Sequence, residues 1–250
     1  MKKINTKSIL AAAFAATVMA VSSSASLSAY AESSVSNEEF GGDYATVNSD
    51  DYQRYLGTLS DEQLQLIAEK ERVAAKFETE LSTERYATTR AATLIGVPGT
   101  FTIYQQETNT YCVPACIKSV LMYTTNSSPS QASIDSTINM NFTKIPDYVN
   151  ARQSKCNYVL STSPTQSTLT SHIKSDITSW EVPSFLRISG TSETSWYYAT
   201  NGHCVLSNGI YDDQSIVLIA DPLGERVTDC PYFYEKPAST VANYTTHQCW

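Results

Sequence analysis

Apolar positions recur at helical spacing in the first third of the chain. Leu66, Val73, Phe77 and Leu81 are one or two helical turns apart, which predicts a single apolar stripe along one face of a helix. Directly before them, Ser60-Asp61-Glu62-Gln63 has the spacing of a capping box, in which Ser60 and Gln63 each bond the backbone amide of the other. We therefore predict a helix from Ser60 to about Glu84.

Beyond Leu94 the pattern changes to short segments rich in aromatic and β-branched residues. The stretch Phe101–Tyr104 is typical of a short strand, and an apolar run that begins at Cys112 predicts a buried helix. Ser/Thr-rich residues 124–133 predict a loop, and helical patterns follow near 130–139 and 166–177.

Strand-like segments dominate the last third. We predict strands at 182–188, 203–211 and 215–220, with residues 212–214 as the turn between the last two. Helices followed by an antiparallel sheet indicate an α+β fold.

The N-terminus has the pattern of an export signal. Lys2, Lys3 and Lys7 precede an apolar stretch over residues 9–21, and Ala29-Tyr30-Ala31 then has the small-x-small form of a cleavage site. We predict that residues 1–31 are a secretory signal peptide. No later stretch is apolar for long enough to span a membrane. We therefore expect a secreted, extracellular protein of bacterial type, with no membrane attachment after cleavage.

Residues 32–92 form an acidic, partly helical extension before the domain at 93–250. Two interpretations remain open: a pro-region that covers the active-site cleft until it is cut away, or a helix packed permanently on the domain. The formal net charge is −8 and becomes more negative when the three lysines of the signal are removed. An acidic protein is a poor ligand for nucleic acid, because such binding depends on neutralising phosphates. The oligomeric state is not indicated.

Four polar residues stand at the positions where a thiol hydrolase needs them. Cys112 begins a helix, and a helix N-terminus lowers the cost of forming a thiolate. His203 begins a strand and is a candidate base, and Asp221, which ends the next strand, is a candidate partner for the imidazole. Gln106, just before the Cys112 helix, is a candidate donor to the developing oxyanion, together with the Cys112 amide.

These residues resemble the peptidase C39-like proteins of the papain-like fold. The resemblance covers residues 97–225 and rests on Gln106-x5-Cys112-Val113-Pro114-Ala115, on His203 at a strand start and on Asp221-Pro222 at a strand end. It implies a papain-like cysteine peptidase fold, in which a helix bearing Cys112 packs on an antiparallel sheet bearing His203 and Asp221. It also implies peptide or protein substrates and no cofactor or metal. Val113 departs from the family, which usually has Gly there.

Other residues offer alternatives to these assignments. Gln105 is a second candidate oxyanion donor, and Cys116 is a second candidate nucleophile. His172 is expected on a polar surface, and His247 is expected to be structural or exposed. Trp196-Tyr197-Tyr198 either lines a substrate cleft or belongs to the core. The cysteines and histidines lack the spacing of a zinc site.

The six cysteines leave a further alternative open, because export permits disulfides. If Cys112 is a free nucleophile, five cysteines remain, and at least one of them has no partner within the chain. We therefore expect a secreted cysteine peptidase. The alternatives are a cell-wall peptide amidase on the same fold, or a catalytically silent, disulfide-stapled binding domain.

Overall fold

The computed structural model describes residues 55–84, 91–227 and 229–250. The predicted signal peptide, the polar segment that follows it and the junction at 85–90 lie outside the described residues. Six labelled helices and seven strands form the described fold. The helices are α3 (Asp61–Glu84), α4 (Cys112–Thr125), α5 (Gln131–Ile138), α6 (Ile145–Asn150), α7 (Gln166–Ser175) and α8 (Ala238–Tyr244). The strands are β1 (Leu94–Gly96), β2 (Leu160–Thr162), β3 (Ser184–Ile188), β4 (His203–Tyr211), β5 (Ile216–Ala220), β6 (Phe233–Pro237) and β7 (Thr245–Cys249).

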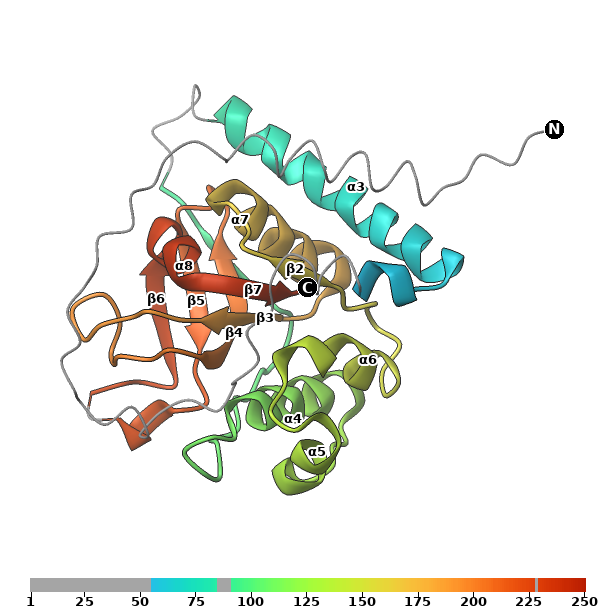
Figure 1. Ribbon diagram of the computed structural model, residues 1–250. Helices are drawn as coiled ribbons and strands as arrows, with labels where there is room; N and C mark the ends of the chain where they lie inside the picture. The colour runs from blue at the N-terminus through green and yellow to red at the C-terminus, as the bar shows by residue number, and fades with distance from the viewer. Residues whose placement is uncertain (1–54, 85–90, 228) are drawn as a thin grey trace, which may run out of the picture.

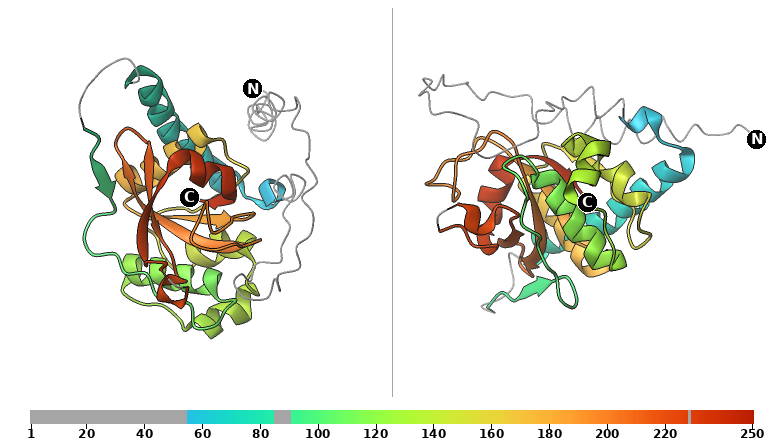
Figure 2. Two further views of the ribbon diagram at one scale, coloured as in Figure 1. Left: turned by 90° about the vertical axis from the view of Figure 1, so that its left-hand side faces the viewer. Right: turned by 90° about the horizontal axis from the view of Figure 1, so that it is seen from below.

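The strands build one antiparallel sheet, which confirms the α+β class. Their order is β2-β7-β3-β4-β5-β6, and β1 pairs with the second half of β4. Helices cover both faces: α4, α5 and α6 lie on one side, while α7 and α8 lie on the other, with α3 outside α7 (Figure 1). Two further views show the same layers from the side and from below (Figure 2).

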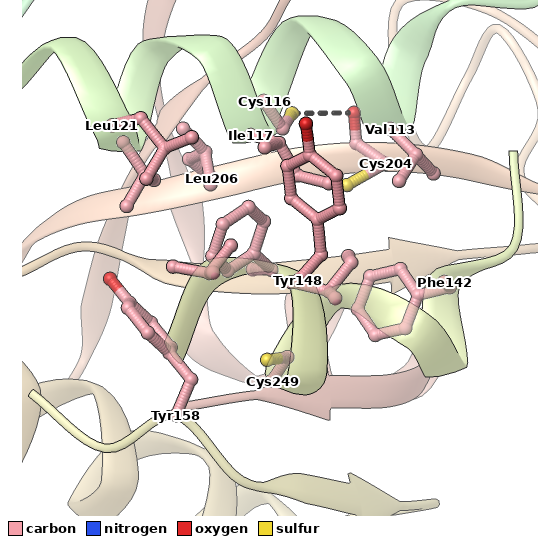
Figure 3. Close-up of a cluster of buried hydrophobic side chains, with 14 of the residues drawn as sticks. Val113, Cys116, Ile117, Leu121, Phe142, Tyr148, Tyr158, Cys204, Leu206 and Cys249 are labelled. Carbon is pink, nitrogen blue, oxygen red and sulfur yellow. Dashed lines mark hydrogen bonds between the residues drawn. The ribbon is translucent and has the colours of Figure 1, made fainter. Parts of the chain in front are cut away.

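Alternating residues of the central strands fill the two cores. Phe185 and Leu206 face α4, whereas Leu186 and Val205 face α7. This alternation follows from the two-residue period of a strand, and it explains why β3 is buried along its whole length. The core under α4 is shown in Figure 3, where Cys204 of β4 lies beneath Cys116 of α4.

Helix α3 confirms the predicted start but not the predicted stripe. The Ser60 amide donates to Gln63 Oε1 over 2.9 Å, and the Gln63 amide donates to Ser60 Oγ over 3.2 Å, so the capping box is formed. Leu66, however, is 44% exposed. The buried positions are instead Leu64, Ile67, Lys70 and Ala74. The buried face of α3 passes through Lys70, and a search for apolar residues alone does not find a face that includes a lysine.

Several predicted elements are confirmed, and one is wrong. The segments at 203–211 and 215–220 are β4 and β5, and the helices near 130 and 166 are α5 and α7. Phe101–Tyr104 is not a strand, because the Tyr104 amide donates to the Ser119 hydroxyl instead of to a neighbouring strand. The strand in this region is β1, a few residues earlier.

The described cysteines do not form the disulfides that export would permit. All six are buried, and no disulfide joins any two of them. The stapled binding domain therefore loses the feature on which it rested. Within the described part of the chain, helices that combine the length and apolar character of a membrane span are absent.

Candidate active site

The sheet and α4 bring three of the predicted site residues to one end of the fold. Cys112 is the first residue of α4, His203 is the first residue of β4, and Asp221 directly follows β5. Strands β4 and β5 are antiparallel neighbours with Leu206 opposite Ala220. This register places the start of β4 beside the end of β5, so two residues far apart in the sequence become neighbours.

The imidazole of His203 is bonded to the carboxylate of Asp221. His203 Nε2 lies 2.9 Å from Asp221 Oδ1, and both side chains are fully buried. The other ring nitrogen, Nδ1, makes no bond of full hydrogen-bond geometry. Cys112 is nonetheless close enough for a hydrogen-bonding contact that contributes to the pKa of His203. Because Nε2 is taken by Asp221, Nδ1 is the nitrogen that remains for the thiol.

The environment of His203 favours the imidazolium. Burial alone lowers its pKa, but the charge of Asp221 and the hydrogen bond to it act in the opposite direction, and the Cys112 contact adds to them. The result is a pKa raised to about 10. A proton on His203 is therefore held through neutral pH, and an imidazolium beside a thiol is one of the two devices that stabilise a thiolate.

Four donors converge on the carboxylate of Asp221. Oδ1 accepts from His203 and, over 2.9 Å, from the Leu223 amide. Oδ2 accepts from the hydroxyls of Tyr198 and Tyr234, the second at 2.7 Å. Burial raises the pKa of Asp221, but the charge of His203 and these bonds outweigh it and lower the pKa below its ordinary value. The carboxylate is therefore ionised although it is out of contact with water.

Gln106 is joined to the same end of the fold. Its backbone amide donates to the Pro222 carbonyl over 2.9 Å, which ties the loop before α4 to the residue after Asp221. Its side chain is buried, with Nε2 donating to the Thr108 carbonyl over 2.8 Å, while Oε1 has no hydrogen-bond partner. The side-chain amide is thus only partly satisfied within the described chain.

The two alternative site residues lie in different surroundings. Gln105 is exposed, and its carbonyl accepts from Gln131 Nε2. The Cys116 thiol donates to the Cys204 carbonyl over 3.3 Å, as the dashed line in Figure 3 shows. Burial raises the pKa of Cys116, which disfavours a thiolate there. Val113 is also fully buried and belongs to the core under α4.

The remaining histidines are not on the surface, so the expectation for His172 was wrong. His172 is 2% exposed and stacks on Trp250 with ring centroids 3.5 Å apart. Its Nδ1 lies 3.0 Å from Gln248 Oε1, and its Nε2 lies 3.4 Å from Glu71 of α3. The helix face is covered by α3, which a local pattern does not reveal. His247 is buried on β7.

Sequence reasoning missed the tyrosines behind Asp221. Trp196 and Tyr198 are 2% and 3% exposed, which agrees with packing in the core, yet Tyr198 also donates to Asp221. The sequence predicts no role for Tyr234 on β6, because a tyrosine that faces inward on the strand next to β5 is a weak signal. No group of His, Cys, Asp and Glu side chains able to hold a metal ion occurs among the described residues.

A thiol at a helix start beside a carboxylate-bound imidazole is typical of hydrolases that attack with sulfur. Residues 99–247 match the model of the Peptidase_C39 like family, and the chain belongs to this family. It is therefore a member of a peptidase family, whose substrates are peptides or proteins. A search of curated proteins returned no match.

Proposed function

We propose that this protein is a cysteine peptidase that cleaves peptide bonds through Cys112, His203 and Asp221 in a papain-like arrangement. The observation that carries the proposal is the 2.9 Å bond between His203 Nε2 and Asp221 Oδ1, with Cys112 beside the same ring. Family membership supports the peptide-bond chemistry.

Each group has a defined task in the proposed reaction. The Cys112 sulfur attacks the carbonyl carbon, and the electron pair of the C=O bond moves to its oxygen. The proton on His203 Nδ1 then passes to the departing amine as the C–N bond breaks, which leaves an acyl group on Cys112. Nδ1 next removes a proton from water, whose oxygen displaces the sulfur and releases the acid.

The oxyanion is assigned to two donors. The Cys112 amide lies in the first turn of α4, at the positive end of the helix dipole. Tyr111, the residue before it, makes no side-chain cap to this helix. The Gln106 side-chain amide is the second donor, held near Asp221 by the bond of its backbone to Pro222. Removing one such donor costs about 100-fold or more in kcat.

Export is part of the proposal and rests on the N-terminal pattern alone. Lys2, Lys3 and Lys7, the apolar stretch after them and the Ala29-Tyr30-Ala31 site are those of a secreted protein. The proposed enzyme acts outside the cell once residues 1–31 are removed. N-terminal sequencing of protein recovered from culture medium tests this step.

The decisive comparison is Cys112→Ala against Cys116→Ala. The two thiols are one helical turn apart on α4 and are equally buried, but only Cys112 contacts His203, whereas the Cys116 thiol donates to the Cys204 carbonyl. We expect hydrolysis of a casein-type substrate to be lost in Cys112→Ala and retained in Cys116→Ala. Full activity in Cys112→Ala contradicts the proposal. If the protein cleaves peptidoglycan and not casein, the proposed catalytic residues stand, and the substrate is cell-wall peptide.

A further inference from the structure

The carboxylate of Asp221 is held by two tyrosines that the triad does not include. Tyr198 and Tyr234 both donate their hydroxyls to Oδ2, while Oδ1 faces His203. Tyr198 comes from the segment before β4, and Tyr234 comes from β6, so the two donors reach the same oxygen from different elements. Each oxygen of the carboxylate therefore has its own set of partners.

We propose that Tyr198 and Tyr234 are positioning residues for Asp221, which keep the buried carboxylate ionised and directed at the His203 ring. This inference rests on the proposed function of the same site. It assigns to the two phenols a task in the reaction that neither performs by touching substrate.

The direction of the Tyr234 hydrogen bond is fixed by a third side chain. Trp196 Nε1 lies 2.7 Å from the Tyr234 oxygen, and an indole nitrogen is a donor only. Tyr234 therefore accepts from Trp196, and its single proton points at Asp221. Lys236 lies over the rings of Trp196 and Tyr234, with its Nζ 5.3 and 5.9 Å from their centroids.

Tyr198 is held just as firmly. The Thr191 hydroxyl donates to its carbonyl over 2.8 Å, which fixes the backbone of the segment. Its ring stands edge-on to the His203 ring, with centroids 5.4 Å apart and planes at 88°. Tyr198 thus touches both members of the His–Asp pair, and a Tyr198→Phe change keeps the ring contact while removing the hydroxyl.

Electrostatics favour donation by both phenols. Burial and the nearby Asp221 charge raise the pKa of Tyr198 and of Tyr234 well above the ordinary value, so both stay protonated. A buried carboxylate that loses hydrogen-bond donors becomes harder to ionise. A neutral or misdirected Asp221 no longer stabilises the imidazolium, so we expect the pKa of His203 to fall when the hydroxyls are removed.

Other titratable groups also face this cluster and are left unchanged in the test. The titratable groups that interact with Asp221, His203 or the two tyrosines are Cys112, Cys116, Cys204, Cys230 and Lys236. Burial raises the pKa of Cys116, Cys204 and Cys230, so these three thiols add no charge near neutral pH.

The test compares Tyr198→Phe, Tyr234→Phe and the double variant with Tyr158→Phe, in the full chain. Tyr158 is a matched control: it is fully buried and its hydroxyl donates to the Pro183 carbonyl over 2.8 Å. Its loss costs a buried hydrogen bond without affecting Asp221. The chain has three histidines, so NMR titration of labelled imidazoles follows the His203 pKa directly, with assignment by His203→Gln.

We expect the double variant to lower the His203 pKa by about one unit or more. The alkaline limb of the kcat/KM profile should move to lower pH by the same amount. Tyr158→Phe should change neither. If the double variant does not fold, the two single variants carry the test, each with a smaller shift in the same direction.

An unchanged His203 pKa in the double variant, beside a lowered one in Asp221→Asn, overturns the positioning role and leaves the proposed function intact. A raised His203 pKa also overturns the positioning role, because the two phenols would then weaken the attraction of the Asp221 carboxylate for the imidazolium. If Cys112→Ala keeps full activity, the proposed function fails, yet the NMR titration still decides what the tyrosines do.

Discussion

The side-chain amide of Gln106 carries two hydrogens on Nε2, and the bond to the Thr108 carbonyl uses one of them. In the proposed reaction, the bond to Thr108 fixes the orientation of the Gln106 amide before negative charge develops on the substrate carbonyl oxygen, and the second hydrogen remains for that oxygen. This is the condition for electrostatic stabilisation without reorganisation at the moment of reaction. The burial of Gln106 excludes water, which would otherwise compete for the second donor.

Replacing Gln106 by Ala should lower kcat by about 100-fold or more, with a much smaller change in KM, because the lost bond forms mainly in the transition state. Gln105→Ala, next to it but exposed, should leave both constants nearly unchanged. Steady-state kinetics on one peptide substrate is the measurement. Equal effects of the two changes, or a loss confined to KM, would speak against an oxyanion donor.

At the scale of elements, the turn after β5 is shaped by one glycine. Gly224 has φ +45°, and a Cβ at this position would lie 2.1 Å from the ring of Tyr232. The neighbouring Leu223 amide donates to Asp221. The same glycine therefore permits both the positive φ and the close approach of the tyrosine beside the candidate site.

Gly224→Ala should destabilise the fold more than Gly190→Ala does. Gly190 also has a positive φ, +73°, but nothing lies within 4 Å of the added methyl group. Both changes cost backbone strain of about 1–2 kcal/mol, and only Gly224→Ala adds a clash, worth about 1–3 kcal/mol more. Urea unfolding of the two variants gives the difference directly. Equal losses would mean that the Tyr232 ring moves aside without cost.

The elements that carry the candidate site were predictable because each begins or ends at a polar residue. His203 is the first residue of β4 and Asp221 follows the last residue of β5. The start of β4 and the end of β5 can therefore be read from the apolar runs that these two polar residues bound. Strands β2, β6 and β7 were not predicted. Strand β2 has three residues and pairs with β7, which is more than 80 positions away in the chain. Local patterns do not contain such a partner.

Single residues were missed for the same reason when a distant element decided their environment. Lys70 is charged, but its ammonium group donates hydrogen bonds to Asp176 and Cys156 in the interior. It therefore lies on the buried face of α3. His172 lies on a polar helix face that α3 then covers through Glu71. The sequence left Tyr198 open between a substrate cleft and the core and gave no prediction for Tyr234, because their contact with Asp221 depends on how β5 and β6 pair.

For the molecule as a whole, Lys70 links the N-terminal helix to the rest of the fold. Its Nζ lies 3.0 Å from Asp176 Oδ1 and 3.1 Å from Cys156 Sγ, with the Trp250 ring centroid at 4.8 Å. Burial lowers the pKa of Lys70, but Asp176 and Cys156 outweigh this and raise it. Burial raises the pKa of Asp176, which depends on Lys70 for its charge.

These contacts favour one of the two interpretations of the N-terminal extension. Helix α3 packs on α7, on the opposite side of the sheet from α4, so this helix does not itself cover Cys112 (Figure 1). We propose that α3 stays with the domain in the active protein. A pro-region, if one is removed, then ends before this helix.

Lys70→Met should destabilise the fold by about 3–5 kcal/mol, because it leaves the buried Asp176 carboxylate without its cation and with the Ser184 hydroxyl as its remaining donor. Lys76→Met, on the exposed side of the same helix, is the control and should have little effect. The double change Lys70→Met with Asp176→Leu should recover much of the loss. Denaturant unfolding measures all three. If Lys70→Met unfolds at the same denaturant concentration as Lys76→Met, the Lys70–Asp176 contact does not stabilise the packing of α3 on the domain. The result would then favour the interpretation of α3 as part of a removable pro-region.

The position of β7 has a consequence for how the chain acquires its shape. This strand follows the other six in the sequence but lies between β2 and β3 in the sheet. A chain that emerges from the ribosome N-terminus first therefore cannot close its sheet until residues 245–249 have appeared. Contacts of such long range slow folding. A sheet that stays open until these residues have been synthesised leaves the chain unfolded for longer, which suits passage through a translocation channel in the export proposed above.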